Sequence, residues 1–406
     1  MKIDIKYYKN LIILGFIGIP IGIIVGILDT IFGKVLLKIT EIRQTYPIYL
    51  IPFLALAGVI IIYCYNKFGG KSIKGMSLIF EVSQNKEEKI PLRLIPFIIL
   101  STWITHLFGG SAGREGVAVQ IGATISNWFG EKIKIQNFSK VFLITGMAAG
   151  FSGLFQTPIA ATFFAVEVLI AGSIHYSSLV PAIIASFTSS TVSRLMGLEK
   201  FSFDLSANIS LNFNIILKLI ILGIIFGLVG GGFAFCLKYT KNILNNRFKN
   251  PLLRIFVLGI VLSVLFLIFH MGRYSGLGTN LIDNSFYNGK IYFYDWILKF
   301  ILTILTLSIG FQGGEVTPLF SIGASLGVLL AKIFNLPIEF VASLGYLSIF
   351  GSATNTLIAP IFIGAEVFGY KYIPYFFIVS SFAYTFNFNK SIYSLQQHNK
   401  DIIIKE

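Results

Sequence analysis

Long apolar stretches, separated by short basic loops, constrain this chain more than any other feature. Five of them contain at most one charged residue each: Leu11–Ile31, Ile51–Tyr63, Ile215–Cys236, Ile255–Phe269 and Trp296–Ile309. Only 12% of all residues are charged, about half the share in an ordinary soluble domain. A straight membrane crossing takes about 20 residues, so the shorter stretches predict tilted or re-entrant helices. The sequence therefore predicts an all-α polytopic membrane protein.

Basic residues are concentrated in the loops, and the chain carries a net charge of +14. The clusters are Lys2, Lys6 and Lys9; Lys67, Lys71 and Lys74; Lys132, Lys134 and Lys140; and Lys238, Lys241, Arg247 and Lys249. Loops rich in lysine stay in the cytoplasm, so we expect a cytoplasmic N-terminus and a bacterial-type plasma membrane. Charge scattered over membrane loops does not indicate a nucleic-acid partner. Cys64 and Cys236 lack metal-ligand spacing, so we expect neither a metal site nor a cofactor.

An internal repeat divides the chain into two related halves. Phe155–Leu169 matches Thr354–Phe368 at a constant offset of 199 residues, which pairs Glu167 with Glu366. We expect one repeat at 10–197, a second at 210–398 and a short cytoplasmic tail at 399–406. Inverted repeats with broken helices are a common transporter architecture, in which helix N-termini face an anionic substrate. We therefore expect two inverted repeats of tilted and re-entrant helices.

Each half also carries an acid flanked by glycines within an apolar setting. Glu115 lies in GREGVAVQ (Gly113–Gln120), and Glu315 lies in GGEVTP (Gly313–Pro318). Charged residues at bilayer depth are costly, so those that occur usually face a pathway. The structural alternatives are an Arg114–Glu115 salt bridge, disfavoured because neighbours on a helix diverge, and a Glu315 side chain that caps its own helix.

These motifs, in this order, resemble the CLC family of anion transporters over essentially the whole chain. GREGVAVQ resembles the family's GREGP element, GMAAGFSGLFQTPIAATFFAVEVL its glycine–alanine-rich segment, and GGEVTPLFSIGASLG its GGxFxP element. Three departures resemble the fluoride/proton antiporter branch: Val117 in place of proline, Met76 of GMSLI in place of serine, and GGEVTP itself. Val168 replaces the inner glutamate that passes protons in chloride/proton exchangers, which leaves the inner proton route unassigned.

The resemblance implies a secondary active transporter, not an enzyme, that exports fluoride from the cytoplasm in exchange for protons. Glu115 would be the proton-coupled gate, and Glu315 a second acid on the proton or fluoride path. Met76 would withhold a hydroxyl donor that suits chloride. The expected anion-binding residues are Met76, Gly116, Val117, Val316, Thr317 and Tyr393. A homodimer with one pathway per subunit is also implied.

Other functions fit parts of the sequence. A CLC-type chloride channel or chloride/proton exchanger is the nearest alternative, because channels and antiporters share one scaffold. Gly109–Gly113 matches the G-x-S-x-G pattern of serine hydrolases, but that motif needs a strand before Ser111, where a helix is expected. For Asp29, Lys218 and Glu366, which lie in apolar stretches, we expect nothing beyond interhelical pairing or a cavity.

Overall fold

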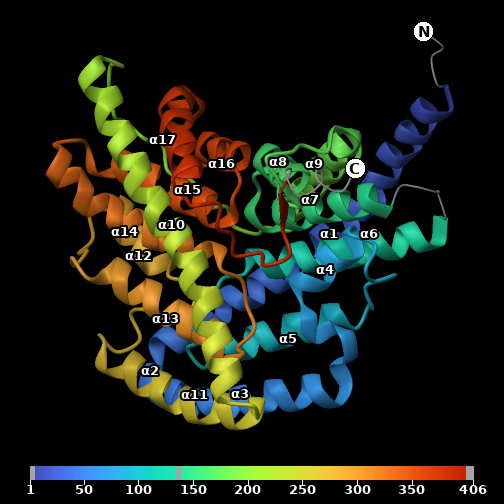
Figure 1. Cartoon of the computed structure of the whole chain (residues 1–406), viewed down its shortest axis with the longest axis horizontal. Coiled ribbons are helices and arrows are strands. Elements are labelled where there is room, and N and C mark those ends of the chain that lie inside the picture. Colours follow the sequence, from blue (N-terminus) through green and yellow to red (C-terminus); the bar gives the residue numbers. More distant parts are fainter. Residues whose placement is uncertain (1–4, 134–138, 399–406) are drawn as a thin grey trace.

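A computed structural model describes residues 5–133 and 139–398, and within these ranges the chain is almost entirely helical (Figure 1). The helices before residue 200 are α1 (Ile5–Thr45), α2 (Pro47–Leu50), α3 (Leu54–Cys64), α4 (Met76–Ser83), α5 (Leu94–Leu107), α6 (Glu115–Ile133), α7 (Ser139–Phe155), α8 (Pro158–Glu167) and α9 (Leu179–Leu195). Those after it are α10 (Phe213–Arg247), α11 (Pro251–Ile268), α12 (Thr279–Phe286), α13 (Asp295–Ile309), α14 (Val316–Phe334), α15 (Ile338–Thr354), α16 (Ile358–Phe368) and α17 (Ile373–Thr385).

Short elements connect these helices. Five are brief helical segments: η1 (Ile51–Phe53), η2 (Tyr65–Gly69), η3 (Gly70–Lys74), η4 (Tyr176–Ser178) and η5 (Tyr370–Tyr372). Two short strands, β1 (Ile170–Ala171) and β2 (Gln397–His398), pair in parallel. This pairing attaches the end of the described chain to the loop that follows α8.

Full-length and short apolar helices are mixed in this fold. Five described segments are long and apolar enough to cross a membrane: Ile12–Thr45, Pro47–Ser83, Phe213–Arg247, Pro251–Ile268 and Val316–Phe334. Other helices, among them α8 and α16, are apolar but too short to cross a membrane in a straight line. This mixture confirms the predicted all-helical, multi-pass membrane architecture.

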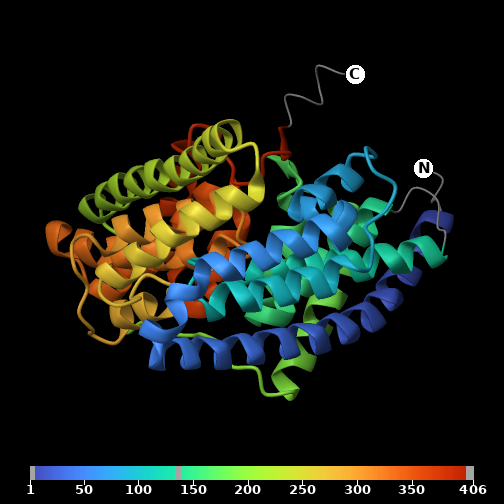
Figure 2. The same cartoon turned by 90° about the horizontal axis from the view of Figure 1, so that it is seen from below.

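The two halves lie side by side, with the first drawn in blue and green and the second in yellow to red (Figure 2). In each half the same two helices are pressed together at glycines. A Cβ atom on Gly146 of α7 would lie 2.2 Å from the carbonyl oxygen of Gly122 in α6, and one on Gly345 of α15 would lie 2.1 Å from that of Gly323 in α14. Small residues therefore let the backbones touch, as in other membrane helix pairs.

The halves meet along α8 and α16. The rings of Phe163 and Phe362, equivalent positions in the repeat, stack with centroids 4.8 Å apart. Glu167 and Glu366 each accept hydrogen bonds from the start of the opposite helix; the donors are the backbone N–H groups of Leu357, Ile358 and Ala359 for Glu167, and of Ile159 and Ala160 for Glu366. Glu366 thus makes an interhelical contact, one of the two roles that the sequence left open for it.

Two other membrane-embedded charges also have defined surroundings. Lys218 of α10 donates to the carbonyl oxygen of Phe334, at the end of α14, over 2.7 Å. Asp29 of α1 is fully buried, and within the described residues its carboxyl oxygens have no hydrogen-bond partner. The boundaries 10–197 and 210–398 remain a prediction, and the predicted tail 399–406 lies outside the described residues.

Candidate functional site

Two long helices begin almost head to head at the centre of the molecule. Gly113, just before α6, and Gly314, just before α14, form an antiparallel bridge in which the N–H of Gly314 donates to the carbonyl of Gly113 over 2.8 Å. A Cβ on Gly314 would lie 2.9 Å from the nitrogen of Gly116, so glycine is required for this approach. The partial positive charges of both helix N-termini therefore point into one small region.

The carboxylate of Glu115, the first residue of α6, occupies this region and is fully buried. Its Oε2 accepts from the backbone N–H of Thr317 over 3.0 Å and from that of Arg114 over 3.1 Å. The hydroxyl of Thr317 donates to Oε1. Three donors from the starts of two helices thus hold one carboxylate, and the same donors suit any small anion that replaces it.

Arg114 lies beside this carboxylate, with its Nε 3.7 Å from Oε1 of Glu115. The sequence disfavoured such an ion pair because adjacent helical residues diverge. That expectation is wrong, since α6 begins at Glu115 and Arg114 precedes the helix. Within the described residues, Nε and Nη1 of Arg114 are buried without a hydrogen-bond partner. The guanidinium therefore has free donors next to the carboxylate.

A cavity of about 470 Å³, called the vestibule below, reaches from the surface to the glycine bridge, where Gly116 and Gly313 line it. Of the residues expected to bind the anion or the proton, four line it: Met76, Gly116, Glu315 and Tyr393. The other four, Glu115, Val117, Val316 and Thr317, are buried behind this lining. The predicted residues are therefore brought together in two layers, one open to the vestibule and one sealed from it.

Each of the four lining residues contributes a different surface. Met76 is the first residue of α4 and follows Gly75, whose φ of +53° favours glycine. Glu315 is half-buried, and its side chain makes no hydrogen bond that caps α14, so the self-capping alternative is not observed. Tyr393 packs its ring on Phe80, with centroids 5.4 Å apart. Gly116 exposes backbone only.

The vestibule is strongly basic, which the sequence reasoning missed. Among the described residues, four cations line it, Lys74, Lys238, Lys241 and Arg254, whereas Glu315 is its only acid. Lys74 is paired with Glu81 and Glu87, but Lys238 and Lys241 form no ion pair within the described residues. The sequence pattern predicts a loop for both lysines, whereas they belong to α10.

The lysines belong to a polar stripe near the end of α10. Lys238, Lys241, Asn242 and Asn245 follow one another at helical spacing and all line the vestibule. A stripe with positions i, i+3, i+4 and i+7 in an otherwise apolar helix marks one polar face. That periodicity is the signal by which the sequence alone could have revealed this wall.

Ser111, in the loop between α5 and α6, has a structural role. Its hydroxyl receives a hydrogen bond from Nζ of Lys299 over 2.8 Å and contacts the hydroxyl of Thr303 at 2.8 Å. The segment before this loop is α5, so the strand required by the serine-hydrolase motif is replaced by a helix. Lys299 is fully buried and thereby anchors the loop that precedes Glu115.

Comparisons with known proteins cover nearly the whole chain. A family model described as "Voltage gated chloride channel" matches residues 57–387. A curated protein of Pseudomonas syringae pv. tomato, named "Chloride/fluoride channel protein", is 30% identical over 391 residues, which cover 94% of this chain and 86% of that protein.

Solved structures extend the comparison. The crystal structure of a CLC-type fluoride/proton antiporter is similar with a TM-score of 0.95 and 54% identity, over 97% of this chain and 99% of that one. A slow cyanobacterial Cl⁻/H⁺ antiporter is similar with a TM-score of 0.77 at 19% identity, covering 91% and 93% of the two chains. At that lower identity the likeness concerns the fold alone.

Proposed function

The chain belongs to the CLC family of voltage-gated chloride channels and related transporters, and we propose that it exports fluoride from the cytoplasm in exchange for protons. The observation that carries the proposal is the likeness to a CLC-type fluoride/proton antiporter, at 54% identity over 97% of this chain. In this function the chain is a secondary active transporter, not an enzyme.

Glu115 is the gate in this proposal. While charged, its carboxylate takes the donors of Thr317 and Arg114 that a fluoride ion would otherwise use. A protonated carboxyl accepts hydrogen bonds more weakly than a carboxylate, so protonation lets the side chain leave, and a small anion then accepts the same hydrogen bonds. Fluoride suits this site because it is a compact acceptor. One position thus holds either a carboxylate or an anion, which couples the two movements.

Glu315 supplies a second acid where the route opens into the vestibule. In the part of the chain that the structure describes, it is the only acid that lines the vestibule, so a proton that reaches the vestibule meets a carboxylate there. Its place next to Gly116 links it to the start of α6 and hence to the gate. This position supports a share of the proton path, replacing the inner glutamate for which this chain has Val168.

Met76 sets the chemistry of the vestibule wall near the site. A thioether offers no hydrogen-bond donor. An anion beside Met76 therefore receives its hydrogen bonds from backbone N–H groups and from the hydroxyl of Tyr393. Gly116, Val117 and Val316 bring the helix starts close without side-chain donors of their own, which favours a small, hard anion over a large one.

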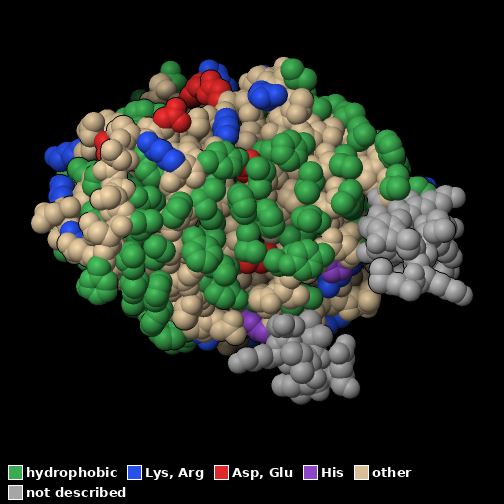
Figure 3. All heavy atoms as spheres, turned by 90° about the horizontal axis from the view of Figure 1, so that it is seen from above, with side chains coloured by type: hydrophobic (Ala, Val, Ile, Leu, Met, Phe, Trp, Pro, Cys, Tyr) green, Lys and Arg blue, Asp and Glu red, His purple; other side chains and the backbone are tan. Residues whose placement is uncertain are grey.

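We also propose a plasma-membrane location, a cytoplasmic N-terminus and a homodimer. Basic residues gather in the vestibule and in the loops, which supports the assignment of that side of the protein to the cytoplasm. Figure 3 looks onto the face that α8, α9, α16 and α17 form at the top of Figure 1, and apolar side chains cover much of it. Among the apolar residues of these helices, Val180 and Phe187 of α9 and Phe377 of α17 are exposed. A second copy would bury such a face.

Flux measurements in sealed vesicles test the proposal. Vesicles loaded with fluoride should take up protons as fluoride leaves down its gradient, and chloride in place of fluoride should drive much less proton movement. The name of the Pseudomonas relative keeps a channel as the second candidate. Fluoride efflux without any proton movement would identify a channel, and equal proton uptake with chloride would identify a chloride/proton exchanger.

A further inference from the structure

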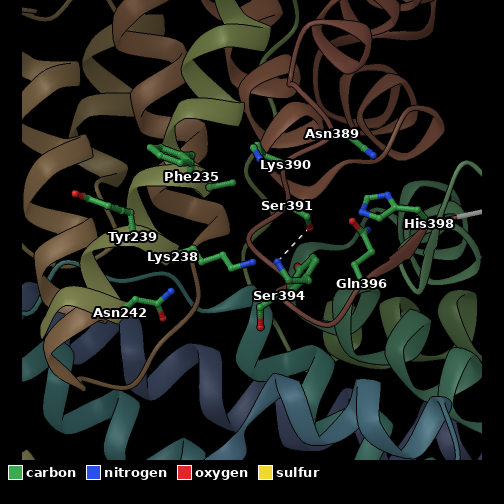
Figure 4. Close-up of a pocket in the computed structure, with 12 residues that line it drawn as sticks. Phe235, Lys238, Tyr239, Asn242, Asn389, Lys390, Ser391, Ser394, Gln396 and His398 are labelled. Atoms are coloured by element: carbon green, nitrogen blue, oxygen red, sulfur yellow. Dashed lines mark hydrogen bonds between the residues drawn. The ribbon is translucent and has the colours of Figure 1, made fainter. Parts of the chain in front are cut away.

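A second cavity, of about 420 Å³, lies beside the vestibule between α10 and the segment that follows α17 (Figure 4). We call it the side cavity. It shares Lys238, Asn242, Ser391, Tyr393 and Ser394 with the vestibule lining. Figure 4 shows Lys238 extending from α10 toward the segment that carries Ser391 and Ser394. The side cavity therefore adjoins the proposed fluoride route at Tyr393.

The side cavity offers positive charge and hydrogen-bond donors. Lys238 and Lys390 line it, no aspartate or glutamate does, and neither lysine forms an ion pair within the described residues. Oδ1 of Asn389 accepts from Asn355, which leaves the amide hydrogens of Asn389 available. Ser394 adds a hydroxyl. Such a set suits an anion with several acceptor oxygens.

Aromatic side chains form the outer wall of this cavity. Phe235 and Tyr239, one turn apart on α10, stack with ring centroids 5.8 Å apart and are 51% and 57% exposed. Exposed aromatic residues beside lysines are typical of the level at which a membrane meets water. Basic pockets at this level are suited to acidic lipid headgroups. The cavity is thus accessible to a phosphate from the membrane as well as from solution.

We propose that the side cavity binds a phosphate group, carried by an anionic phospholipid headgroup or present as free inorganic phosphate. Fluoride needs no space of this size, whereas the cavity has room for a tetrahedral phosphate together with the rest of a lipid headgroup, and its lysines can donate to the phosphate oxygens. Because Lys238 also lines the vestibule, a phosphate there neutralises charge that would attract fluoride. Occupancy therefore slows fluoride capture from this side. That consequence rests on the proposed function, but the binding itself does not.

Native mass spectrometry of the full chain tests the lipid arm. The wild-type protein should retain phosphatidylglycerol over phosphatidylcholine, and Lys390→Gln should reduce this preference about fivefold, as expected for one lysine near a membrane surface. Lys390 lines the side cavity but not the vestibule and is exposed, so its substitution leaves the fold intact. Lys249→Gln, an exposed lysine in the loop after α10, is the matched control and should keep the wild-type preference.

Inorganic phosphate added to the protein in phosphatidylcholine nanodiscs tests the free ion. A higher thermal midpoint in the wild type but not in Lys390→Gln would identify free phosphate as sufficient. Phosphatidylglycerol retention without this shift would identify the lipid. The proposal is overturned if neither phosphate source binds, or if Lys390→Gln and Lys249→Gln behave alike. These binding results stand even if proton-coupled fluoride flux is absent, so the two proposals fail separately.

Discussion

Glu167 and Glu366 each hold the start of a helix that belongs to the other half of the chain. Glu167, at the end of α8, accepts from the first N–H groups of α16, including that of Ala359 over 3.3 Å. Glu366, in α16, accepts from those of α8, including that of Ala160 over 2.9 Å. A carboxylate at a helix N-terminus accepts hydrogen bonds from the free N–H groups and interacts favourably with the positive end of the helix dipole. The two repeats are therefore fastened to each other by the same contact made twice.

Glu167→Gln should weaken the junction of the two halves. The amide turns an NH₂ group toward N–H donors that the carboxylate now satisfies, and hydrogen bonds to a charged group contribute about 1.5–3 kcal/mol. We expect a lower midpoint of thermal unfolding in detergent. Glu41→Gln is the control, because Glu41 lies exposed in a pair with Lys38. Equal midpoints for the two variants would contradict the role of Glu167.

Gly345→Ala should destabilise the protein through backbone overlap. Its Cβ would meet the carbonyl oxygen of Gly323 at 2.1 Å, and relieving such overpacking costs about 1–3 kcal/mol. Gly232→Ala in α10 is the matched control, because nothing lies within 4 Å of its Cβ position. That variant should be neutral or more stable, by up to about 1 kcal/mol. Thermal unfolding of both variants gives the comparison.

Lys241→Gln should slow fluoride capture through the vestibule in a salt-dependent way. Removing one unpaired cation from a basic cleft lowers the local anion concentration, and we expect about a threefold loss of flux at low ionic strength. The loss should shrink at about 0.15 M salt, where charges are screened beyond about 8 Å. Lys249→Gln, outside the vestibule lining, should transport at the wild-type rate. A loss that persists unchanged at high salt points to a steric cause.

Glu115→Gln should abolish proton coupling. The amide resembles the protonated acid in shape, but it cannot release a proton. Fluoride flux down its gradient tests that the variant is folded, while proton uptake in the same vesicles reports the coupling. A Glu115→Gln protein that still pumps protons against a gradient would place the proton carrier elsewhere.

Met76→Ser should raise chloride flux relative to fluoride. One hydrogen bond to a charged group contributes roughly 1.5–3 kcal/mol, which corresponds to about a tenfold or larger change in relative occupancy. Met76→Ala is the control, since it opens the same space without adding a donor. Equal gains in both variants would identify size as the filter. No gain in either would move selectivity to Val117, Val316 or Glu315.

The membrane class, the repeat and the two glycine-flanked acids could all be predicted from the sequence. Apolar length and helical periodicity are local properties, and Glu167 and Glu366 align because their surroundings repeat. The sequence also indicated Met76 and Thr317 as members of the site. It did not indicate which of them face water, because that depends on how separate helices pack.

Only the tertiary structure determined the contacts of the gate. Gly113 and Gly314 approach from opposite halves of the chain, and this approach places the hydroxyl of Thr317 on Glu115. The polar stripe of α10 becomes a vestibule wall only because α4 and the segment around Tyr393 pack opposite it. The hydropathy pattern indicates which face of a single helix is apolar. The donors around a buried carboxylate are set by contacts between distant segments, which no local pattern encodes.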